Sequence, residues 1–243
     1  ATAYQGSRVL EVLFDGDKAT GVRAKLADGT TREFAAKVVV DATGQSALIG
    51  RKLKLTTPEP KLKKGAIYTH FAGGQRNEGI DEGATLVLHT ENGDSWFWYI
   101  PLPDDKVSVG VVGDMDYLLR GRKEDPQQIF DGELAKCAPM QERMQNAEQL
   151  MPVRSTKDFS YRASRIAGEG WVLVGDAFCF LDPMYSSGVY LALKSGEMAA
   201  DAITEAFDKD DFSAAQLGEF GPELIRGMEA VRRMIYAFYS RDF

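Results

Sequence analysis

The chain is 243 residues long, with 44% hydrophobic, 27% charged and 10% aromatic residues and a formal net charge of -7. This length suits one large domain or two interleaved ones with a sizeable core. The negative charge argues against nucleic acid as the main partner, and the chain lacks the run of about 18 apolar residues that would predict a membrane span. The two cysteines have neither disulfide nor metal-ligand spacing, and the N-terminus lacks a signal-peptide pattern. We therefore expect no metal site and a cytoplasmic location.

The first 44 residues predict a three-stranded meander. Asp-Gly turn signals follow the first two runs, Val9–Phe14 and Gly21–Leu26. The third run, Phe34–Val40, leads into Val38-Val-Val-Asp-Ala-Thr-Gly44, whose continuous apolar residues are typical of a strand buried on both faces. The glycine at its end permits close approach of a neighbour or a ligand.

From about Thr56 to Phe159 the character of the chain changes. Four segments of alternating apolar and polar residues predict an antiparallel sheet: Ala66–Phe71, Ala84–Thr90, Trp96–Leu102 and Val107–Val112. A polar helix is expected from Pro126 to about Gln149.

A buried strand is expected again at Gly170-Trp-Val-Leu-Val-Gly-Asp176. The loop Leu181–Gly188 follows, and a helix should start between Ser186 and Val189. A strand end followed by a helix N-terminus is where open α/β sheets bind ligands, and the Asp176 carboxylate suits a ribityl or ribose hydroxyl better than a phosphate. The local pattern fits equally well a simpler alternative, in which Asp176 caps a helix and the serine pair forms an N-cap.

Two helices are expected to complete the chain. The first has a stripe with core-facing spacing: Val189, Ala192, Leu193, Gly196, Ala199, Ala200, Ile203 and Phe207. The second is expected from about Ser213 to Tyr239, with an aromatic end. Because α/β-like segments flank the antiparallel insert, the two ends of the chain should pack together as one discontinuous domain.

No Gly-x-Gly-x-x-Gly motif and no Walker loop occurs in the sequence. An FAD site normally uses such a glycine-rich unit to hold the ADP pyrophosphate. The meander begins as though a first βαβ unit were absent, so we expect about 30 or more further residues before Ala1.

The order of these motifs resembles the FAD-dependent group of aromatic hydroxylases, geranylgeranyl reductases and flavin-dependent halogenases. The resemblance is carried by Val38–Gly44 with Ser46 and Arg51 after it, and by Gly175-Asp176 with Pro183. It covers nearly the whole chain but not that group's N-terminal dinucleotide motif.

Two segments favour the halogenases within this group. Trp96-Phe-Trp-Tyr-Ile-Pro101 is similar to their Trp-x-Trp-x-Ile-Pro signature, and Ser186-Ser-Gly-Val189 resembles them more than the reductases. The alternative for the tryptophans is that they belong to the core of a sheet.

The resemblance implies an α/β plus α+β fold with an incomplete, aromatic hydroxylase-like FAD-binding domain. This discontinuous domain would comprise residues 1–56 and 160–212. An antiparallel-sheet substrate domain would be inserted at 57–159, and a C-terminal helix would occupy 213–243.

The resemblance also implies a cofactor site formed by two strand ends and the loop before the long helix. Its residues would be Asp176, Thr43, Gly44, Pro183, Ser187, Gly188 and Val189. Asp176 would bind the ribityl chain of FAD, with Thr43 and Gly44 near the diphosphate. A chloride or bromide ion would lie at the helix start, at Ser186, Ser187 and Gly188, where backbone N–H groups are free.

Trp96 and Trp98 would separate the flavin from the substrate, so that oxygen is transferred to halide instead. In an extended strand both indoles should share one face, with Phe97 and Tyr99 on the other. We expect the indole face to look toward the Pro183–Val189 loop.

Two departures from the family pattern matter. Tyr185 occupies the place of the catalytic glutamate of the tryptophan-halogenating branch, which favours phenols, pyrroles or carrier-bound aromatics as substrates. The family's essential lysine lies upstream of this sequence, so no lysine here is assigned that role.

The expected function is an FAD-dependent, halogenase-like oxidoreductase that uses reduced flavin, oxygen and halide on a small electron-rich aromatic substrate. The substrate would be free or bound to a carrier protein, and a flavin reductase would be a partner. A flavin monooxygenase or alkene reductase is the alternative within the fold. A catalytically inert fragment or binding module without FAD is the alternative from another class.

Overall fold

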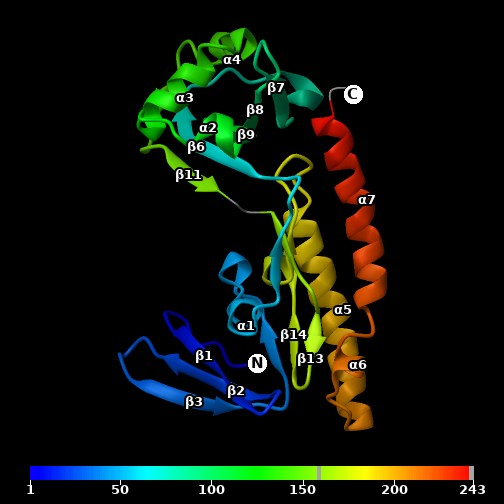
Figure 1. The fold of residues 1–243 in the computed structure, drawn as a ribbon. Helices are drawn as coiled ribbons and strands as arrows, with labels where there is room; N and C mark the ends of the chain where they lie inside the picture. The colour runs from blue at the N-terminus through cyan, green and yellow to red at the C-terminus, as the bar shows by residue number, and fades with distance from the viewer. Residues whose placement is uncertain (158–159, 241–243) are drawn as a thin grey trace. The chain divides into compact units, whose positions relative to one another are not determined.

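The computed structural model describes residues 1–157 and 160–240 and divides the chain into two units (Figure 1). Unit 1 comprises residues 1–59 and 160–243, and unit 2 comprises residues 60–159. The chain thus leaves unit 1 once and returns to it once.

Unit 1 begins with the expected meander. Strands β1 (Arg8–Asp15), β2 (Lys18–Lys25) and β3 (Thr31–Ala35) pair antiparallel in the order β1-β2-β3. The expectation of one unbroken third strand to residue 40 is wrong. β3 ends at Ala35, and β4 (Val39–Asp41) belongs to a different sheet, so the apolar run covers two strands and the crossing between them.

The second sheet of unit 1 has the order β13-β14-β4. β14 (Trp171–Leu173) is fully buried, pairing parallel with β4 and antiparallel with β13 (Ala167–Gly168). It is therefore the buried strand that the sequence predicts, and it is central in this sheet. The expectation that 38–40 is buried on both faces is wrong, because Val40 is 46% exposed. Among the described residues β4 pairs only with β14, at the edge of the sheet.

Unit 1 contains a third small sheet. Its order is β15-β12-β5, formed by β15 (Cys179–Phe180), β12 (Tyr161–Ala163) and β5 (Thr56–Pro58). Strands β5 and β12 lie next to the residues where the chain leaves and re-enters the unit. Short helical turns follow two strand ends: η1 (Gly44–Ser46) and α1 (Leu48–Lys52) after β4, and η3 (Gly175–Ala177) after β14.

Helix α5 (Gly188–Lys209) begins within the expected window. Its predicted buried stripe is confirmed at Ala199 but is wrong at Val189, Leu193 and Phe207, which are 73%, 71% and 54% exposed. The buried residues are small ones: Ser195, Ala199, Ala202 and Ala206. A prediction from apolar spacing assumes that the large apolar side chains face the core. A helix that packs closely against its neighbours buries small residues instead.

The single last helix expected from 213 to 239 is also wrong. The chain forms α6 (Ala214–Leu217) and α7 (Gly221–Tyr239), separated at Gly218. Pro222 lies in the first turn of α7. Proline lacks an N–H group and clashes with the preceding turn, so it begins a helix here and cannot continue one.

Unit 2 is built on the antiparallel sheet that the sequence predicts. The order β10-β6-β9-β8-β7 joins β6 (Lys64–Ala72), β9 (Lys106–Asp114), β8 (Ser95–Leu102) and β7 (Leu86–His89). Two short strands pair with β6 at its outer edge: β10 (Glu148–Gln149) and β11 (Arg154–Lys157). The turn η2 (Gly79–Asp81) precedes β7.

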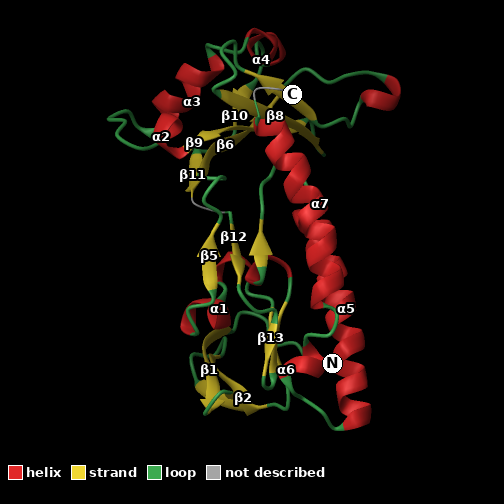
Figure 2. Ribbon diagram, turned by 45° about the vertical axis from the view of Figure 1, so that its right-hand side comes forward, coloured by secondary structure: helices red, strands yellow, loops and turns green. Residues whose placement is uncertain are grey.

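Short helices lie beside this sheet: α2 (Met115–Leu118), α3 (Pro126–Leu134) and α4 (Ala138–Arg143) (Figure 2). The single helix expected from 126 to 149 is wrong, because Pro139 lies in the first turn of α4 and residues 148–149 are a strand. Phe130 and Met140 from these helices pack with Phe97 and Tyr99 in one buried cluster.

A buried carboxylate fixes α3 to the sheet. Glu133 is fully buried and accepts hydrogen bonds from Ser95 Oγ at 2.7 Å, Tyr117 OH at 3.0 Å and Lys136 Nζ at 2.8 Å. Arg122 Nη2 lies 3.3 Å from Glu133 Oε1. Burial alone raises the pKa of Glu133, but the hydrogen bonds from Lys136, Ser95 and Tyr117 outweigh it and lower the pKa below its ordinary value.

No helix within the described part of the chain is both long and apolar enough to cross a membrane.

Candidate functional site

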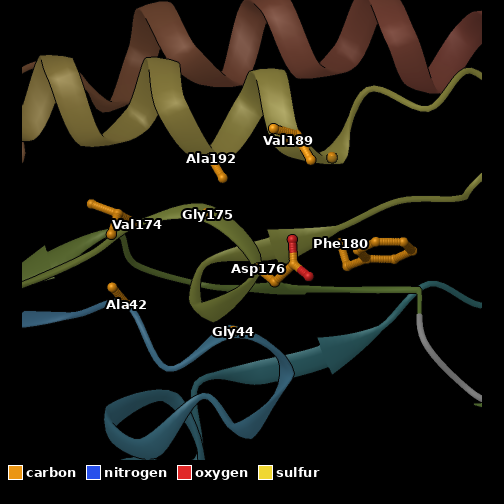
Figure 3. A pocket seen from close by; sticks show the side chains of 9 residues that line it. Ala42, Gly44, Val174, Gly175, Asp176, Phe180, Val189 and Ala192 are labelled. Atoms are coloured by element: carbon orange, nitrogen blue, oxygen red, sulfur yellow. The ribbon is translucent and has the colours of Figure 1, made fainter. Parts of the chain in front are cut away.

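A pocket of ≈ 420 Å³ in unit 1 lies where β4 and β14 end and α5 begins (Figure 3). It is lined by Ala42, Gly44, Val174, Gly175, Asp176, Phe180, Gly188, Val189 and Ala192. The pocket therefore lies outside the carboxyl ends of the two parallel strands, the usual ligand position in open α/β sheets. Four predicted site residues come together here: Gly44, Asp176, Gly188 and Val189.

The other predicted residues of unit 1 do not line this pocket: Thr43, Pro183, Ser186 and Ser187. Each is a chain neighbour of a lining residue or lies in the loop before α5. The Thr43 side chain is engaged in its own turn, because Oγ1 donates to Asp41 Oδ1 at 2.6 Å. The assignment of these four residues stays a prediction.

Asp41 organises the turn after β4. Its buried carboxylate accepts the N–H of Thr43 at 3.0 Å and the N–H of Ile49 at 2.7 Å. The turn passes through Gly44, whose φ of 60° favours glycine, and a Cβ there would meet no atom within 4 Å. Sequence reasoning missed Asp41, although a carboxyl group directly at a strand end was a usable signal.

The Gly175-Asp176 turn is held from two sides. The N–H of Gly175 donates to Ser195 Oγ at 2.8 Å, and the Tyr161 hydroxyl donates to the carbonyl of Asp176 at 2.5 Å. Gly175 has φ 55°, and a Cβ there would lie 3.0 Å from the Cβ of Ala192. Glycine thus lets α5 approach the end of β14. Ser195 and Tyr161 carry no sequence signal for this role, since one is an ordinary helical serine and the other belongs to a three-residue strand.

The Asp176 carboxylate points into the space between its own turn and the first turn of α5 (Figure 3). Burial raises the pKa of this carboxyl above its ordinary value. Burial, together with the Asp176 charge, raises the pKa of Tyr161 to about 12. A hydrogen-bond donor that reached Asp176 would stabilise its charged form. The site is therefore suited to a ligand that offers hydroxyl groups.

Burial also raises the pKa of the nearby Cys179 thiol to about 12, so this cysteine is protonated at neutral pH. It is buried and belongs to the core.

Helix α5 presents an uncapped N-terminus at the pocket. Ser187 occupies the N-cap position, but its side chain makes no capping hydrogen bond. The serine pair thus supplies the N-cap residue by position, as the alternative expects, but no side-chain cap. The first N–H groups of an α-helix have no intrahelical partner, and Gly188 at this end lines the pocket.

The tryptophan pair lies in unit 2. The expected faces of β8 are confirmed: the Trp96 and Trp98 rings are 6.4 Å apart, whereas Phe97 and Tyr99 belong to the buried cluster. Trp98 Nε1 donates to Ser108 Oγ at 3.2 Å, and its ring packs over Gly110 of the adjacent strand. Whether the indole face looks toward the Pro183–Val189 loop stays a prediction.

Across residues 1–157 and 160–240, no group of three or more His, Cys, Asp or Glu side chains could hold a metal ion.

The family model described as tryptophan halogenase matches residues 9–242. The chain therefore belongs to the tryptophan halogenase family, and the resemblance to flavin-dependent halogenases is confirmed.

Among curated proteins, a 1H-pyrrole-2-carbonyl-[peptidyl-carrier protein] brominase of Pseudoalteromonas luteoviolacea is 34% identical over 212 residues, which are 86% of this chain and 52% of that protein. A 1H-pyrrole-2-carbonyl-[peptidyl-carrier protein] chlorinase of Pseudomonas fluorescens is 29% identical over 251 residues, covering 98% of this chain and 54% of that protein. The chain thus spans about half the length of these curated relatives.

Among solved structures, that of a flavin-dependent brominase superposes with a TM-score of 0.87 at 31% identity, covering 96% of this chain and 58% of the other. The mixed α/β fold of this chain is therefore that of flavin-dependent halogenase structures.

Proposed function

We propose that this chain is part of an FAD-dependent halogenase that acts on an electron-rich aromatic ring of the pyrrole or phenol class. The observation that carries the proposal is the pocket at the ends of β4 and β14, where Asp176 meets the uncapped start of α5 in a chain of this family. The two pyrrole-carbonyl relatives support a substrate bound to a carrier protein. A flavin reductase as a second partner and a cytoplasmic location complete the proposal.

The residues present fit an isoalloxazine-bearing dinucleotide. The half-buried Asp176 carboxyl has a raised pKa, which hydroxyl donors from a ribityl chain would offset. Gly44 offers backbone without a side chain, and Val174 and Phe180 offer apolar wall to the ring system. FAD, when bound in reduced form, supplies the electrons that activate oxygen.

Within this proposal the chain's own residues bind and orient FAD. Asp176 orients the ribityl chain, while Thr43 and Gly44 lie near the diphosphate. Pro183 and the backbone of Ser187, Gly188 and Val189 lie beside the flavin ring.

Chloride or bromide is held by the backbone at Ser187 and Gly188, where the helix N-terminus favours an anion. The N–H of Ser186, which was also predicted to bind the halide, donates to the carbonyl of Pro183 at 2.9 Å instead. Trp96 and Trp98 keep the substrate ring away from the flavin. The essential lysine of the family is not assigned to any residue of this chain.

The domain organisation is also part of the proposal. Residues 1–56 and 160–212 form an incomplete FAD-binding domain, 57–159 form the substrate domain and 213–243 form the C-terminal helical segment. The open edge of β4, with Val40 46% exposed, supports pairing with a further strand. Val189 and Tyr190, 73% and 67% exposed at the start of α5, support a covering segment on that helix as well.

Titration of FAD into the intact natural protein tests the cofactor site. Asp176→Ala should lower the FAD affinity about tenfold to a hundredfold, because hydrogen bonds to a charged group contribute roughly 1.5–3 kcal/mol. Asp208→Ala removes an exposed carboxylate elsewhere on α5 and serves as the matched control. Unchanged affinity in Asp176→Ala would remove the residue from the cofactor site.

The reaction itself is tested by supplying reduced flavin, oxygen, bromide and a pyrrole-2-carbonyl carrier protein. A brominated product, detected by mass spectrometry, is expected. An oxygenated product that is independent of halide would instead favour the monooxygenase alternative.

A further inference from the structure

The loop that leads into α5 is joined to the far end of α7. Asp182, which is 3% exposed, stands at the start of this loop. Its Oδ1 accepts the N–H of Met184 at 2.9 Å, and the Tyr239 hydroxyl lies 3.1 Å from Oδ2 and 3.3 Å from Oδ1. Tyr239 is the last residue of α7. One buried carboxylate therefore connects the turn of the loop with a helix that is distant in sequence.

A second contact joins the same two elements. The Tyr185 hydroxyl donates to the backbone carbonyl of Met234 in α7 at 3.4 Å. The next residue, Ser186, has φ 49° and donates its N–H to the carbonyl of Pro183 at 2.9 Å. A left-handed conformation is unfavourable for serine and persists where the surroundings fix it. The last turns of α7 thus contact the segment whose next residues reach the pocket.

We propose that Tyr239 is a positioning residue for the halide: by holding Asp182, it fixes the Pro183–Gly188 segment so that the N–H groups at the start of α5 converge on the ion. This inference rests on the proposed function. A hydroxyl that donates to a carboxylate makes a charge-assisted hydrogen bond, which is both stronger and more directional than a neutral one. Tyr239 acts through Asp182 and not on the reacting atoms.

A comparison of two matched variants of the intact natural protein tests the inference. Tyr239→Phe removes only the hydroxyl at the loop. Tyr236→Phe makes the same change one turn earlier, where the hydroxyl lies 3.3 Å from Arg232 Nη1 instead. Tyr239→Phe should raise the KM for bromide about tenfold, while kcat at saturating bromide and the FAD affinity stay at the wild-type values. Tyr236→Phe should change none of these quantities.

Hydrogen exchange supplies a readout that does not depend on activity. Backbone amides of residues 181–188 should exchange faster in Tyr239→Phe than in the wild type or in Tyr236→Phe. Wild-type KM and wild-type exchange in Tyr239→Phe would overturn the inference. Faster exchange with an unchanged KM for bromide would also overturn it, because the hydroxyl would then serve stability alone. A wild-type protein without any halide dependence would refute the proposed function, whereas the exchange comparison would still decide whether Tyr239 holds the loop.

Discussion

Gly110 provides the space in which the Trp98 indole packs, and Gly110→Ala should displace that ring. A Cβ at this position would lie 2.2 Å from Trp98 Cζ2 and 2.5 Å from Cε2 and Cη2. Carbon atoms normally approach to about 3.5–4.0 Å, so the ring must move by roughly 1.3 Å or more, or the strands must separate. Its Nε1 hydrogen bond to Ser108, 3.2 Å long, would be strained by the same movement.

The expected loss in the free energy of unfolding is about 1–3 kcal/mol, the usual range for overpacking a well-packed site. Urea unfolding measures this loss, and the intrinsic tryptophan emission reports the ring directly. The difference between the emission spectra of the wild type and Trp98→Phe isolates the emission of Trp98 from that of Trp96 and Trp171. In Gly110→Ala this contribution should shift in wavelength or intensity.

Gly132→Ala is the matched control within unit 2, because Gly132 is exposed in α3 and a Cβ there would meet no atom within 4 Å. This control should gain up to about 1 kcal/mol, since alanine is the better helix former. Wild-type stability together with wild-type emission in Gly110→Ala would refute the packing argument. Under the proposed function, Gly110→Ala should also increase flavin oxidation that yields no halogenated product.

Three further outcomes are expected. The free energy of unfolding of the wild type should exceed that of Glu133→Gln by its full amount above the ordinary carboxyl pKa of 4.5. This difference should shrink as the pH falls through the lowered pKa of the folded state, and urea unfolding at several pH values measures it. The FAD affinity of the wild type should fall on acidification already above the ordinary carboxyl pKa of 3.8, because Asp176 has a raised pKa and must be charged to accept hydroxyl hydrogen bonds; titrations of Asp176→Asn should lack this dependence. Cys137 and Cys179 should react with a thiol reagent at pH 8 only after denaturant is added, because both are buried and burial raises both pKa values; rapid labelling of the native protein would contradict their burial.

Periodic patterns predicted the strands well and the helices less well. The alternation in 66–112 predicts the sheet of unit 2 and the faces of β8, because side chains alternate strictly along a strand. The helix breaks at Gly218 and Pro139 were missed, although proline in a first turn is a local signal. Most of the buried face of α5 was missed, with the exception of Ala199, because tertiary contacts decide which side of a helix is covered.

The candidate site was predictable where a motif contains a residue that lines the pocket. Gly44 and Asp176 lie in the turns that follow their strands, and the structure brings both into one pocket with Gly188 and Val189. The residues that hold this geometry could not be predicted in the same way. Ser195 and Tyr161 act through hydrogen bonds to distant segments, and such pairings leave no periodicity in the sequence.

The two crossings between the units lie next to each other. Pro58 of β5 pairs with Tyr161 of β12, and the N–H of Glu59 donates to the carbonyl of Ser160 at 2.9 Å. Residues 60–159 are therefore inserted between two paired antiparallel strands, at the position where a hairpin would have a tight turn. Among the described residues, all those that line the pocket of unit 1 lie outside this insert. A change in the length of the insert therefore requires no change in the register of β5 and β12 or in the backbone that forms the pocket of unit 1.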